Sequence, residues 1–173
     1  MKLFDKIQNL KINCQTVSLE DITIDDKELY YKLYTDEDLN KYWGYDYKTD
    51  APKNPTIDYF FDFCELLKLA KEEYSYAIKL KGEMIGEFVL HGFEENGFEI
   101  GFRIFKEHHG NGYVKDVIKS FINYAKTHVK PNFIKAKCFK QNLASYNLLT
   151  KCGFNNYTND EFYNYFIYNL KAD

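Results

Sequence analysis

The chain has 173 residues, of which 45% are hydrophobic, and a formal net charge of -3. This length suits one buried core, and no Ser/Gly/Pro-rich linker or repeat divides it, so we expect a single domain over residues 1–173. The negative charge, without a basic patch interleaved with aromatic residues, argues against nucleic-acid binding. Short apolar stretches and an N-terminus without a signal-peptide core predict a cytoplasmic protein with no membrane contact.

Cysteines and histidines are not spaced as metal ligands. The four cysteines include no Cys-x-x-Cys pair, so we expect free thiols and no metal. Charge, however, is uneven: residues 1–97 hold 12 Lys+Arg and 20 Asp+Glu, whereas residues 98–173 hold 11 and 6. An acidic first part would attract a cationic substrate and a basic second part an anionic cofactor, although a chance surface distribution explains the split equally well.

The N-terminal part of the chain begins with short elements. Gln15 to Leu19 is predicted as the first strand, and Asp25 to Tyr34 as a short helix. The segment from Leu39 to Tyr47 then places four aromatic residues around a glycine and an aspartate. This density predicts one wall of a substrate pocket, with a hydrophobic lid on the sheet as the alternative. The substrate-binding residues that we predict there are Tyr42, Trp43 and Tyr45.

A helix and a meander of strands follow. Asn54-Pro55 is a helix-start signal with Asn54 as the cap, and apolar residues at helical spacing carry the predicted helix to about Lys71. Two strand-like runs, Tyr74 to Leu80 and Glu83 to His91, are joined at Lys81-Gly82 and predict a hairpin. A turn at residues 94–97 leads into the next strand.

Residues 98–112, FEIGFRIFKEHHGNG, predict a strand that runs into a glycine loop. Gly101 inside the strand marks a place where a backbone or a ligand comes close. Gly110 and Gly112 precede a helix with a strong apolar stripe, so unpaired amides at the helix start would face an anion with the helix dipole behind them. By itself, Gly-Asn-Gly is also an ordinary turn.

The C-terminal part completes a strand, helix, strand unit. Pro131 stops the helix, and Phe133 to Phe139 is predicted as a strand parallel to the one before the glycine loop. Asn142 is predicted to cap a helix that ends at Gly153. Glu161 to Leu170 is predicted as a long aromatic strand, which would pair within the monomer or across a homodimer.

The order of these motifs resembles the GCN5-related N-acetyltransferase (GNAT) superfamily, in particular its RimJ/RimL-like branch. The family's signature is a strand, Gln/Arg-x-x-Gly-x-Gly/Ala and a helix, then a second strand, an Asn, a Ser three residues on and a Gly-Phe turn. Here the matching segments are EIGFRIF at 99–105, EHHGNG at 107–112, Asn142, Ser145 and Gly153-Phe154. The resemblance covers about residues 75–170, and the aromatic segment at 41–47 is similar to one in uncharacterised bacterial members.

The resemblance implies the GNAT acyl-CoA N-acyltransferase fold, an α/β (α+β) domain with a mixed, largely antiparallel sheet of about six to seven strands and about four helices. Acceptor-side elements would occupy roughly residues 1–97, the acetyl-CoA-binding core 98–154 and the C-terminal strand 160–170. It also implies acetyl-CoA as co-substrate, no metal, and direct acetyl transfer to a primary amine of a small molecule or a protein N-terminus. The alternative is a non-catalytic acyl-CoA-binding sensor or interaction domain.

The same resemblance implies a set of cofactor-binding residues. Amides of the glycine loop would hold the pyrophosphate of acetyl-CoA, the strand would accept its pantetheine arm, and an amide near Ile104 or Phe105 would polarise the thioester carbonyl. The implied cofactor-binding residues are Phe102, Arg103, Ile104, His109, Gly110, Asn111, Gly112, Tyr113, Val114, Asn142 and Ser145.

Acetyl transfer needs a neutral amine, and an alkyl ammonium with a pKa of about 10.4 is mostly protonated at neutral pH. We predict Glu99 as the base, because its side chain shares a strand face with Gly101 and Arg103; the alternative is a salt bridge to Arg103. Ser145, with Tyr146 as the alternative, is the candidate for protonating or orienting the departing thiolate.

Two positions depart from the family's pattern. Glu107 stands where the family has Gln or Arg, which removes a hydrogen-bond donor and adds a negative charge close to the pyrophosphate. Leu149 stands seven residues after Asn142, where many GNAT enzymes carry a Tyr that protonates the thiolate. A general acid is therefore not expected from position 149.

Overall fold

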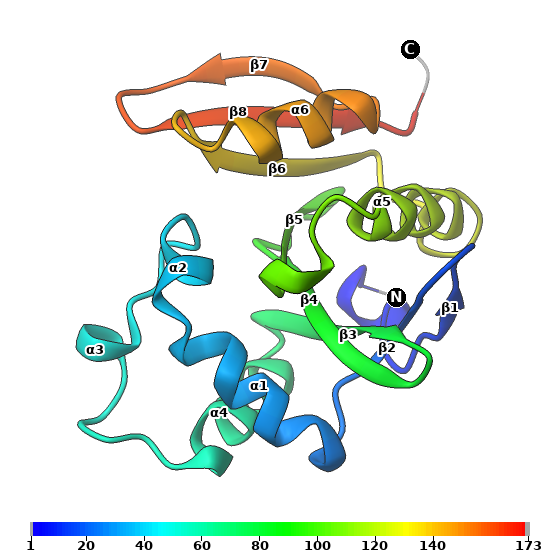
Figure 1. Ribbon diagram of the computed structural model, residues 1–173. Helices are drawn as coiled ribbons and strands as arrows, with labels where there is room; N and C mark the ends of the chain where they lie inside the picture. The colour runs from blue at the N-terminus through cyan, green and yellow to red at the C-terminus, as the bar shows by residue number, and fades with distance from the viewer. Residues whose placement is uncertain (1, 172–173) are drawn as a thin grey trace.

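One mixed sheet runs through the structure, a computed structural model that describes residues 2–171 (Figure 1). Its strands are β1 (Ile12–Asn13), β2 (Ser18–Asp21), β3 (Glu73–Leu80), β4 (Glu83–His91), β5 (Gly97–Ile104), β6 (Phe133–Phe139), β7 (Asn155–Asn159) and β8 (Tyr163–Asn169). They lie in the order β1-β2-β3-β4-β5-β6-β8-β7, and only β5 and β6 pair in parallel within this described part. The mixed, largely antiparallel sheet is confirmed, with eight strands where six to seven were expected.

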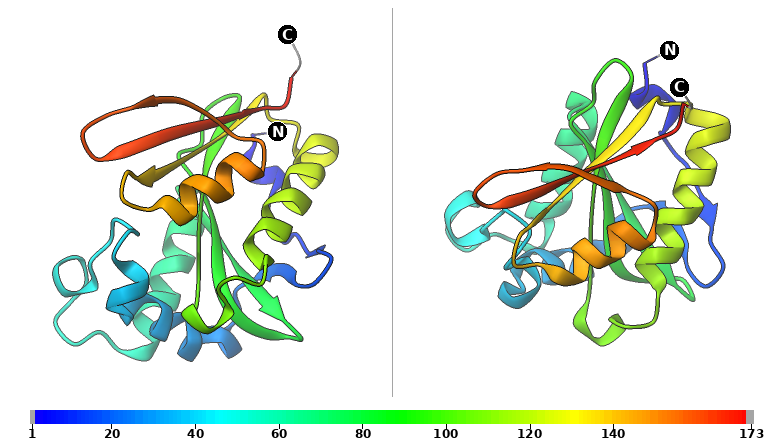
Figure 2. Two further views of the ribbon diagram at one scale, coloured as in Figure 1. Left: turned by 45° about the horizontal axis from the view of Figure 1, so that its top comes forward. Right: turned by 90° about the horizontal axis from the view of Figure 1, so that it is seen from above.

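Helices cover both faces of this sheet (Figure 2). They are α1 (Lys27–Thr35), α2 (Glu37–Asn40), α3 (Tyr47–Asp50), α4 (Ile57–Ala70), α5 (Tyr113–Tyr124) and α6 (Leu143–Lys151). α1 and α4 pack on one face, and α5 and α6 on the other, which are the four main helices expected. Each helix within residues 2–171 is too short or too polar to span a lipid bilayer.

The larger core lies between the sheet and α5. The apolar stripe of this helix is buried from Val114 to Ile122, as its helical periodicity predicts. Its central residue, Phe121, packs on Phe88 and Phe98 with ring centroids 5.1 Å and 6.0 Å away. Burying this ring contributes about 3–5 kcal/mol, judged by the usual cost of truncating a core Phe to Ala. The helix that follows the glycine loop is therefore rigidly placed.

The face under α1 and α4 combines apolar and charged side chains. Tyr34 of α1 stacks on Phe60 of α4 with ring centroids 4.6 Å apart. Glu87 and Arg103 are buried on the same face, which they share because their strands are paired at these two residues. Two charges in this position need partners, since an unpaired buried charge costs several kcal/mol.

The structure corrects two local predictions. Asn54 does not cap α4: it adopts a left-handed conformation, with φ of 57°, and Thr56 is the N-cap. The first predicted strand lies slightly later, at β2, and is preceded by the two-residue β1. The hairpin of β3 and β4 is confirmed, with Lys81 and Gly82 both at positive φ in its turn.

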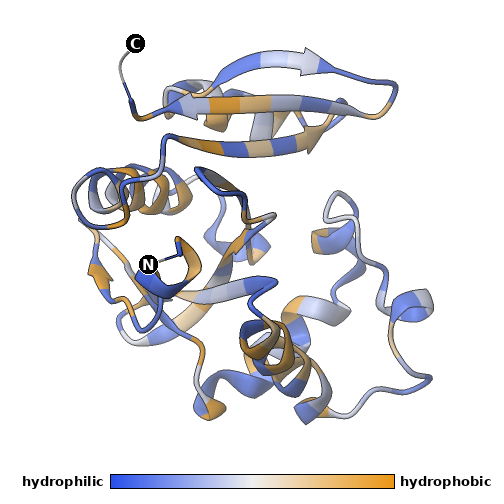
Figure 3. Ribbon diagram, turned by 180° about the vertical axis from the view of Figure 1, so that it is seen from behind, coloured by the Kyte–Doolittle hydropathy of each residue, from blue (hydrophilic) through white to orange (hydrophobic). Residues whose placement is uncertain are grey.

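The C-terminal strand is also part of a hairpin. β8 pairs with β6 on one side and with β7 on the other, so its pairing lies within the monomer. Every residue of β7 is exposed, and its colours run from hydrophilic to neutral in Figure 3. No strand was predicted there, because β7 lacks an alternation of apolar and polar residues.

The two parallel strands separate halfway along. β5 and β6 pair only from Gly97↔Phe133 to Ile100↔Ala136. Beyond this point β5 stays with β4 to the pair Ile104↔Gly86, whereas β6 stays with β8 to the pair Phe139↔Tyr163. Each strand follows its outer neighbour, so the two strands are unpaired beyond this point and leave a gap; β6, β8 and β7 lie together on one side of β5 in Figure 1.

Burial next to a second carboxylate makes Glu73 sensitive to pH. Burial, reinforced by the charge of Glu87, raises the pKa of Glu73 to about 7, from an ordinary value of 4.5. Between these two values the folded chain holds a proton that the unfolded chain has lost, so stability falls as the pH rises through this window.

We therefore expect Glu73→Gln to raise the free energy of unfolding by about 1–3 kcal/mol at pH 8, and to change it little near pH 4.5. Urea denaturation at the two pH values measures this difference. Glu83→Gln, which alters an exposed carboxylate on the neighbouring strand, is the control and should have no such effect. An equal effect of Glu73→Gln at both pH values would contradict the assignment.

Candidate functional site

A cavity of about 540 Å³ lies at the open end of the gap between β5 and β6. Its walls come from four parts of the chain: the segment after α1, the end of β5, the glycine loop with the start of α5, and α6. The lining residues are Asp38, Leu39, Tyr42, Trp43, Phe102, Arg103, Ile104, His108, His109, Gly110, Gly112, Tyr113, Val114, Lys115, Asn142, Ala144, Ser145 and Leu148. Of the predicted site residues, those outside this lining are Tyr45, Glu99, Asn111 and Tyr146.

The glycine loop owes its shape to backbone conformation. Gly110 and Gly112 have φ values of 78° and 79°, which side-chain-bearing residues rarely adopt, and an added Cβ would meet nothing within 4 Å at either position. Asn111 turns its side chain back into the loop, where Nδ2 donates to the carbonyls of His108 and His109 at 3.1 Å. Asn111 thus braces the loop from within.

The start of α5 presents unbonded amides to the cavity. The first bond of the helix runs from the Asp116 amide to the Gly112 carbonyl, and no side chain caps the helix. Between residues 2 and 171, no acceptor is found for the amides from Gly110 to Lys115. Six N–H groups at the positive end of a helix dipole make an anion site, and Lys115 adds a full positive charge to its wall.

The end of β5 presents further unpaired backbone groups. The Phe105 amide donates to the Ile85 carbonyl at 2.9 Å, so it is already used. Because amides alternate in direction along a strand, those of Phe102 and Ile104 point to the other side, where β6 has moved away. Of the two amides predicted to act at this point, only that of Ile104 faces the gap.

The histidine of the loop connects these two parts. His109 Nε2 lies 2.9 Å from the Ile104 carbonyl, so its ring is held against the strand. Glu107, one of the two residues that depart from the family's pattern, lies outside the cavity lining and pairs with Lys32 across 3.7 Å. A backbone hydrogen bond and the Lys32 charge lower the pKa of Glu107. Its carboxylate is therefore directed to α1 instead of the anion site.

The start of α6 forms the opposite wall. Asn142 is confirmed as the cap, because its Oδ1 accepts from the Ser145 amide at 3.1 Å. Asn142 and Ser145 line the cavity, whereas Tyr146 packs on Phe166 with ring centroids 5.2 Å apart. Leu149 is fully buried in the core, so nothing at that position reaches the cavity.

The aromatic segment divides between the cavity and the core. Tyr42 and Trp43 line the cavity, and Trp43 lies over β5, where an added Cβ on Gly101 would come within 3.2 Å of its ring. Tyr45 instead packs edge-on against Tyr34 at 5.4 Å, and burial raises the pKa of Tyr45 to about 12. The pocket wall and the hydrophobic lid were alternatives for the whole segment. Tyr42 and Trp43 belong to the wall, whereas Tyr45 packs as a lid residue does.

Glu99 lies one residue before the last β5–β6 pair, so it is beside the point where the strands separate. Its Oε1 is 3.7 Å from His91 Nε2 and 3.8 Å from Lys137 Nζ. Burial lowers the pKa of His91, although the Glu99 charge opposes this. The alternative of a salt bridge from Glu99 to Arg103 is not found, since Arg103 pairs with Glu87.

Several lining residues carried no sequence signal that singled them out: Asp38, Leu39, His108, Lys115, Ala144 and Leu148. Their positions follow from the tertiary fold, which brings α2, α5 and α6 to one cavity. His108 lies within the segment 107–112, Leu39 at the start of the aromatic segment and Ala144 between Asn142 and Ser145, but their residue types did not mark them as site residues. Within residues 2–171, no group of three or more His, Cys, Asp or Glu side chains is placed to hold a metal ion.

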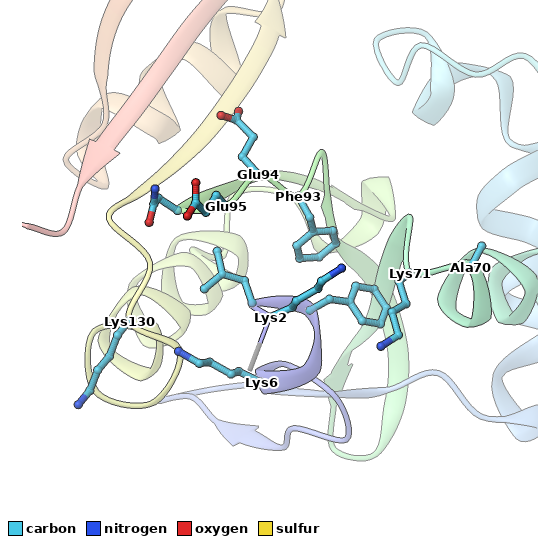
Figure 4. Close-up of a pocket in the computed structure, with 11 residues that line it drawn as sticks. Lys2, Lys6, Ala70, Lys71, Phe93, Glu94, Glu95 and Lys130 are labelled. Atoms are coloured by element: carbon cyan, nitrogen blue, oxygen red, sulfur yellow. The ribbon is translucent and has the colours of Figure 1, made fainter.

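A larger hollow of about 880 Å³ lies at the other end of the molecule, near the N-terminus (Figure 4). Two of its charged side chains are engaged with other groups: Lys6 donates to the Val129 carbonyl at 2.8 Å, and Lys71 pairs with Asp5 at 2.6 Å. Glu94 points away from the hollow in Figure 4 and pairs with Lys135 at 2.5 Å. These groups do not converge on a common point, so this hollow is not a candidate site.

The chain is similar to known acetyltransferases. Residues 16–155 match the family model of the acetyltransferase (GNAT) domain. The uncharacterized N-acetyltransferase YoaA of Bacillus subtilis (strain 168) is 27% identical over 79% of this chain and 77% of its own length.

Solved structures show the same fold. RimL, a ribosomal L7/L12 alpha-N-protein acetyltransferase in complex with coenzyme A, aligns over 95% of this chain and 100% of its own, with a TM-score of 0.77 and 15% identity. Spermidine N-acetyltransferase of Vibrio cholerae, in complex with CoA and spermine, aligns over 90% of this chain and 96% of its own, with a TM-score of 0.75 and 16% identity. With most of its length matched by the family, this chain belongs to the GNAT acetyltransferases, which use acetyl-CoA as the acetyl donor.

Proposed function

We propose that the cavity between β5 and α6 is where this N-acetyltransferase binds acetyl-CoA and acetylates a cationic primary amine. One observation carries the proposal: the unbonded amides from Gly110 to Lys115 and the unpaired edge of β5 meet in one cavity. Acetyl-CoA has both matching parts, a pyrophosphate and an extended arm with amide groups. The family and the relatives do not favour a non-catalytic sensor.

The cofactor residues then divide by what they supply. Gly110, Gly112, Tyr113 and Val114 supply backbone amides to the phosphates. Phe102 and Ile104 offer an unpaired strand edge to the pantetheine arm, with Asn142 on the opposite wall. Asn111 and His109 hold the loop and connect it to β5. Arg103 supplies no group to the cofactor, because its backbone faces its β4 partner Glu87 and its guanidinium is buried and paired.

Two groups are suited to the reacting thioester. The Ile104 amide, which has no strand partner, would donate to the carbonyl oxygen and polarise it. The Ser145 hydroxyl, on the cavity wall, would donate to the departing thiolate or orient it. Between the two candidates for this second role we propose Ser145, because Tyr146 is packed on Phe166.

Glu99 is the proposed base. Its carboxylate lies beside the apex of the gap, on the strand face that carries Gly101 and the overlying Trp43. An ammonium group that enters under Trp43 would lose its proton to Glu99, directly or through one water, and the neutral amine would then attack the thioester. His91 Nε2 lies 3.7 Å from the Glu99 carboxylate, and burial lowers the pKa of His91. His91 is therefore placed to take the proton from Glu99.

The acceptor is proposed to be cationic. One wall of the cavity combines the Asp38 carboxylate with the rings of Tyr42 and Trp43, and aromatic faces and carboxylates both attract an ammonium group. A polyamine such as spermidine suits this wall. A protein N-terminus is the second candidate, as in the RimL structure with the same fold.

Calorimetric titration with acetyl-CoA, followed by a thiol-release assay, tests the proposed function. The amine panel contains spermidine, spermine and a peptide with a free N-terminal serine. We expect saturable binding of acetyl-CoA and thiol release with at least one amine. Absence of binding would overturn the proposal, and binding without release across a broad amine panel would favour the sensor.

The cytoplasmic location and the homodimer stay predictions. Three of the four cysteines are buried and all four are free, which suits a reducing compartment. The edge of β7 is exposed and offers a strand for pairing with a second copy. Light scattering on the purified chain distinguishes monomer from dimer.

Gly110→Glu is expected to weaken acetyl-CoA binding by more than about tenfold, because the new carboxylate occupies and repels the anion site. Gly82→Glu is the matched control, since Gly82 also has a positive φ and open surroundings but lies in the β3–β4 turn. Calorimetry measures both dissociation constants. An unchanged affinity in Gly110→Glu, or an equal loss in Gly82→Glu, would place the anion site elsewhere.

Glu99→Gln is expected to lower kcat at pH 7 by at least about tenfold, with little change in acetyl-CoA affinity. The deficit should shrink as the pH rises toward the amine's own pKa of about 10.4, because more acceptor then arrives neutral. A pH profile of kcat for wild type, Glu99→Gln and the control Glu107→Gln measures this. Wild-type turnover by Glu99→Gln at every pH would remove Glu99 as the base.

A further inference from the structure

Arg103 and Trp43 are the only arginine and the only tryptophan in the chain, and they are in contact. Arg103 belongs to β5, the strand whose edge faces the cofactor slot, and Trp43 belongs to the wall proposed for the acceptor. The Arg103 side chain has no role in the proposed acetyl transfer, although it is a buried charge. Its contacts show what it does.

The contacts with Glu87 anchor the Arg103 guanidinium in the protein. Arg103 Nε donates to one oxygen of Glu87 at 2.8 Å, and Nη2 forms an ion pair with the same oxygen at 2.7 Å. The other oxygen of Glu87 accepts from the Tyr30 hydroxyl at 2.7 Å. Both carboxylate oxygens of Glu87 are therefore satisfied, and the Arg103 side chain is only 3% exposed. This arrangement fixes the guanidinium relative to β4, β5 and α1.

The other contacts reach the segment that carries the acceptor wall. Arg103 Nη1 donates to Asn40 Oδ1, and Asn40 Nδ2 in turn donates to the carbonyls of Leu33, Tyr34 and Asp36 at the end of α1. The Trp43 amide donates to the Asn40 carbonyl at 2.9 Å. Asn40 is thus the joint between α1 and the aromatic segment, and Arg103 holds it from the sheet.

The guanidinium also supports the Trp43 ring directly. Its central carbon lies 4.3 Å from the Trp43 ring centroid and 4.0 Å from that of Tyr34, both within cation–π distance. The tip of the Trp43 ring reaches over Gly101, where only a glycine leaves room for it without a shift. The position of Trp43 therefore depends on two residues of β5, Gly101 and Arg103.

We propose that Arg103 is a positioning residue that holds Trp43, and with it Tyr42, in place as the acceptor wall. This inference rests on the proposed function, because the wall is defined by the acceptor. Through this one side chain, the strand that receives acetyl-CoA also sets the shape of the amine site. Arg103 acts through Trp43 and touches neither reactant.

Arginine suits this role where lysine does not. The planar guanidinium carries five donors, so it can bond Glu87 and Asn40 together while stacking on two rings. A lysine retains the charge that Glu87 needs, but its single ammonium cannot make all of these contacts. Arg103→Lys therefore removes contacts that position Trp43 while keeping the positive charge that Glu87 needs.

Two measurements on Arg103→Lys test the inference: steady-state kinetics with the amine that the panel identifies, and fluorescence of Trp43, the sole tryptophan. We expect the acceptor KM to rise at least about tenfold while the acetyl-CoA dissociation constant stays within about twofold, and the Trp43 emission to shift to the red. Trp43→Leu should raise the acceptor KM similarly, and the double variant should be no worse than either single one.

Two further variants keep the test decisive. Asn40→Ala cuts the same link but leaves the Glu87 pair intact, so it should reproduce the KM effect even if Arg103→Lys does not fold. Lys79→Gln is the control: it removes another buried ion pair, Lys79 with Asp26 at 2.9 Å, and should lower stability without changing the acceptor KM.

The possible outcomes separate this inference from the proposed function. An unchanged acceptor KM in folded Arg103→Lys and in Asn40→Ala, with Trp43→Leu impaired, would overturn the positioning role alone. Equal losses for acceptor and acetyl-CoA would also overturn it, since they indicate a general structural role. An unchanged KM in Trp43→Leu would overturn the acceptor wall itself, and this inference with it.

Discussion

The separation of β5 and β6 after the pair Ile100↔Ala136 is the constraint on which the rest of the structure depends. A continuous sheet would satisfy every backbone group internally and leave no room for a ligand. Here each strand is held by its outer neighbour, so the Phe102 and Ile104 amides remain without a strand partner. Unpaired backbone groups are costly unless water or a ligand meets them, which gives the gap its affinity for an extended, amide-containing arm.

The second feature that organises the molecule is the buried pair of Glu87 and Arg103. Such pairs rarely add net stability, because removing two charges from water costs about as much as their attraction returns. Its value here lies in geometry. One guanidinium fixes Asn40 and Trp43 on the outer side and Glu87 on the inner side, so the proposed donor and acceptor sites share a common support.

Local patterns in the sequence were sufficient for the part of the site that is built locally. The glycine loop, the stripe of α5 and the Asn142 cap depend on neighbouring residues, the parallel strand follows from the strand, helix, strand order, and the structure has each of them. The family resemblance is confirmed by the match over residues 16–155. It connected the order of these motifs with acetyl-CoA binding.

Features that depend on tertiary neighbours were missed or misplaced. Arg103 was given Glu99 as a possible partner, whereas its register neighbour on β4 is Glu87, 16 residues earlier. Asn54 and Thr56 are both good caps, and nothing local decides between them. β7 has no apolar face, so periodicity could not identify it. Asp38 reaches the cavity only because α2 folds toward it.

Acetyl-CoA is proposed to bind the amides from Gly110 to Lys115 together with those of Phe102 and Ile104. Hydrogen–deuterium exchange with and without acetyl-CoA measures this directly, because amides without an acceptor exchange quickly until a ligand covers them. We expect new protection in peptides that cover residues 101–105 and 109–116. Unchanged exchange there, or protection confined to residues 93–96 at the other hollow, would contradict it.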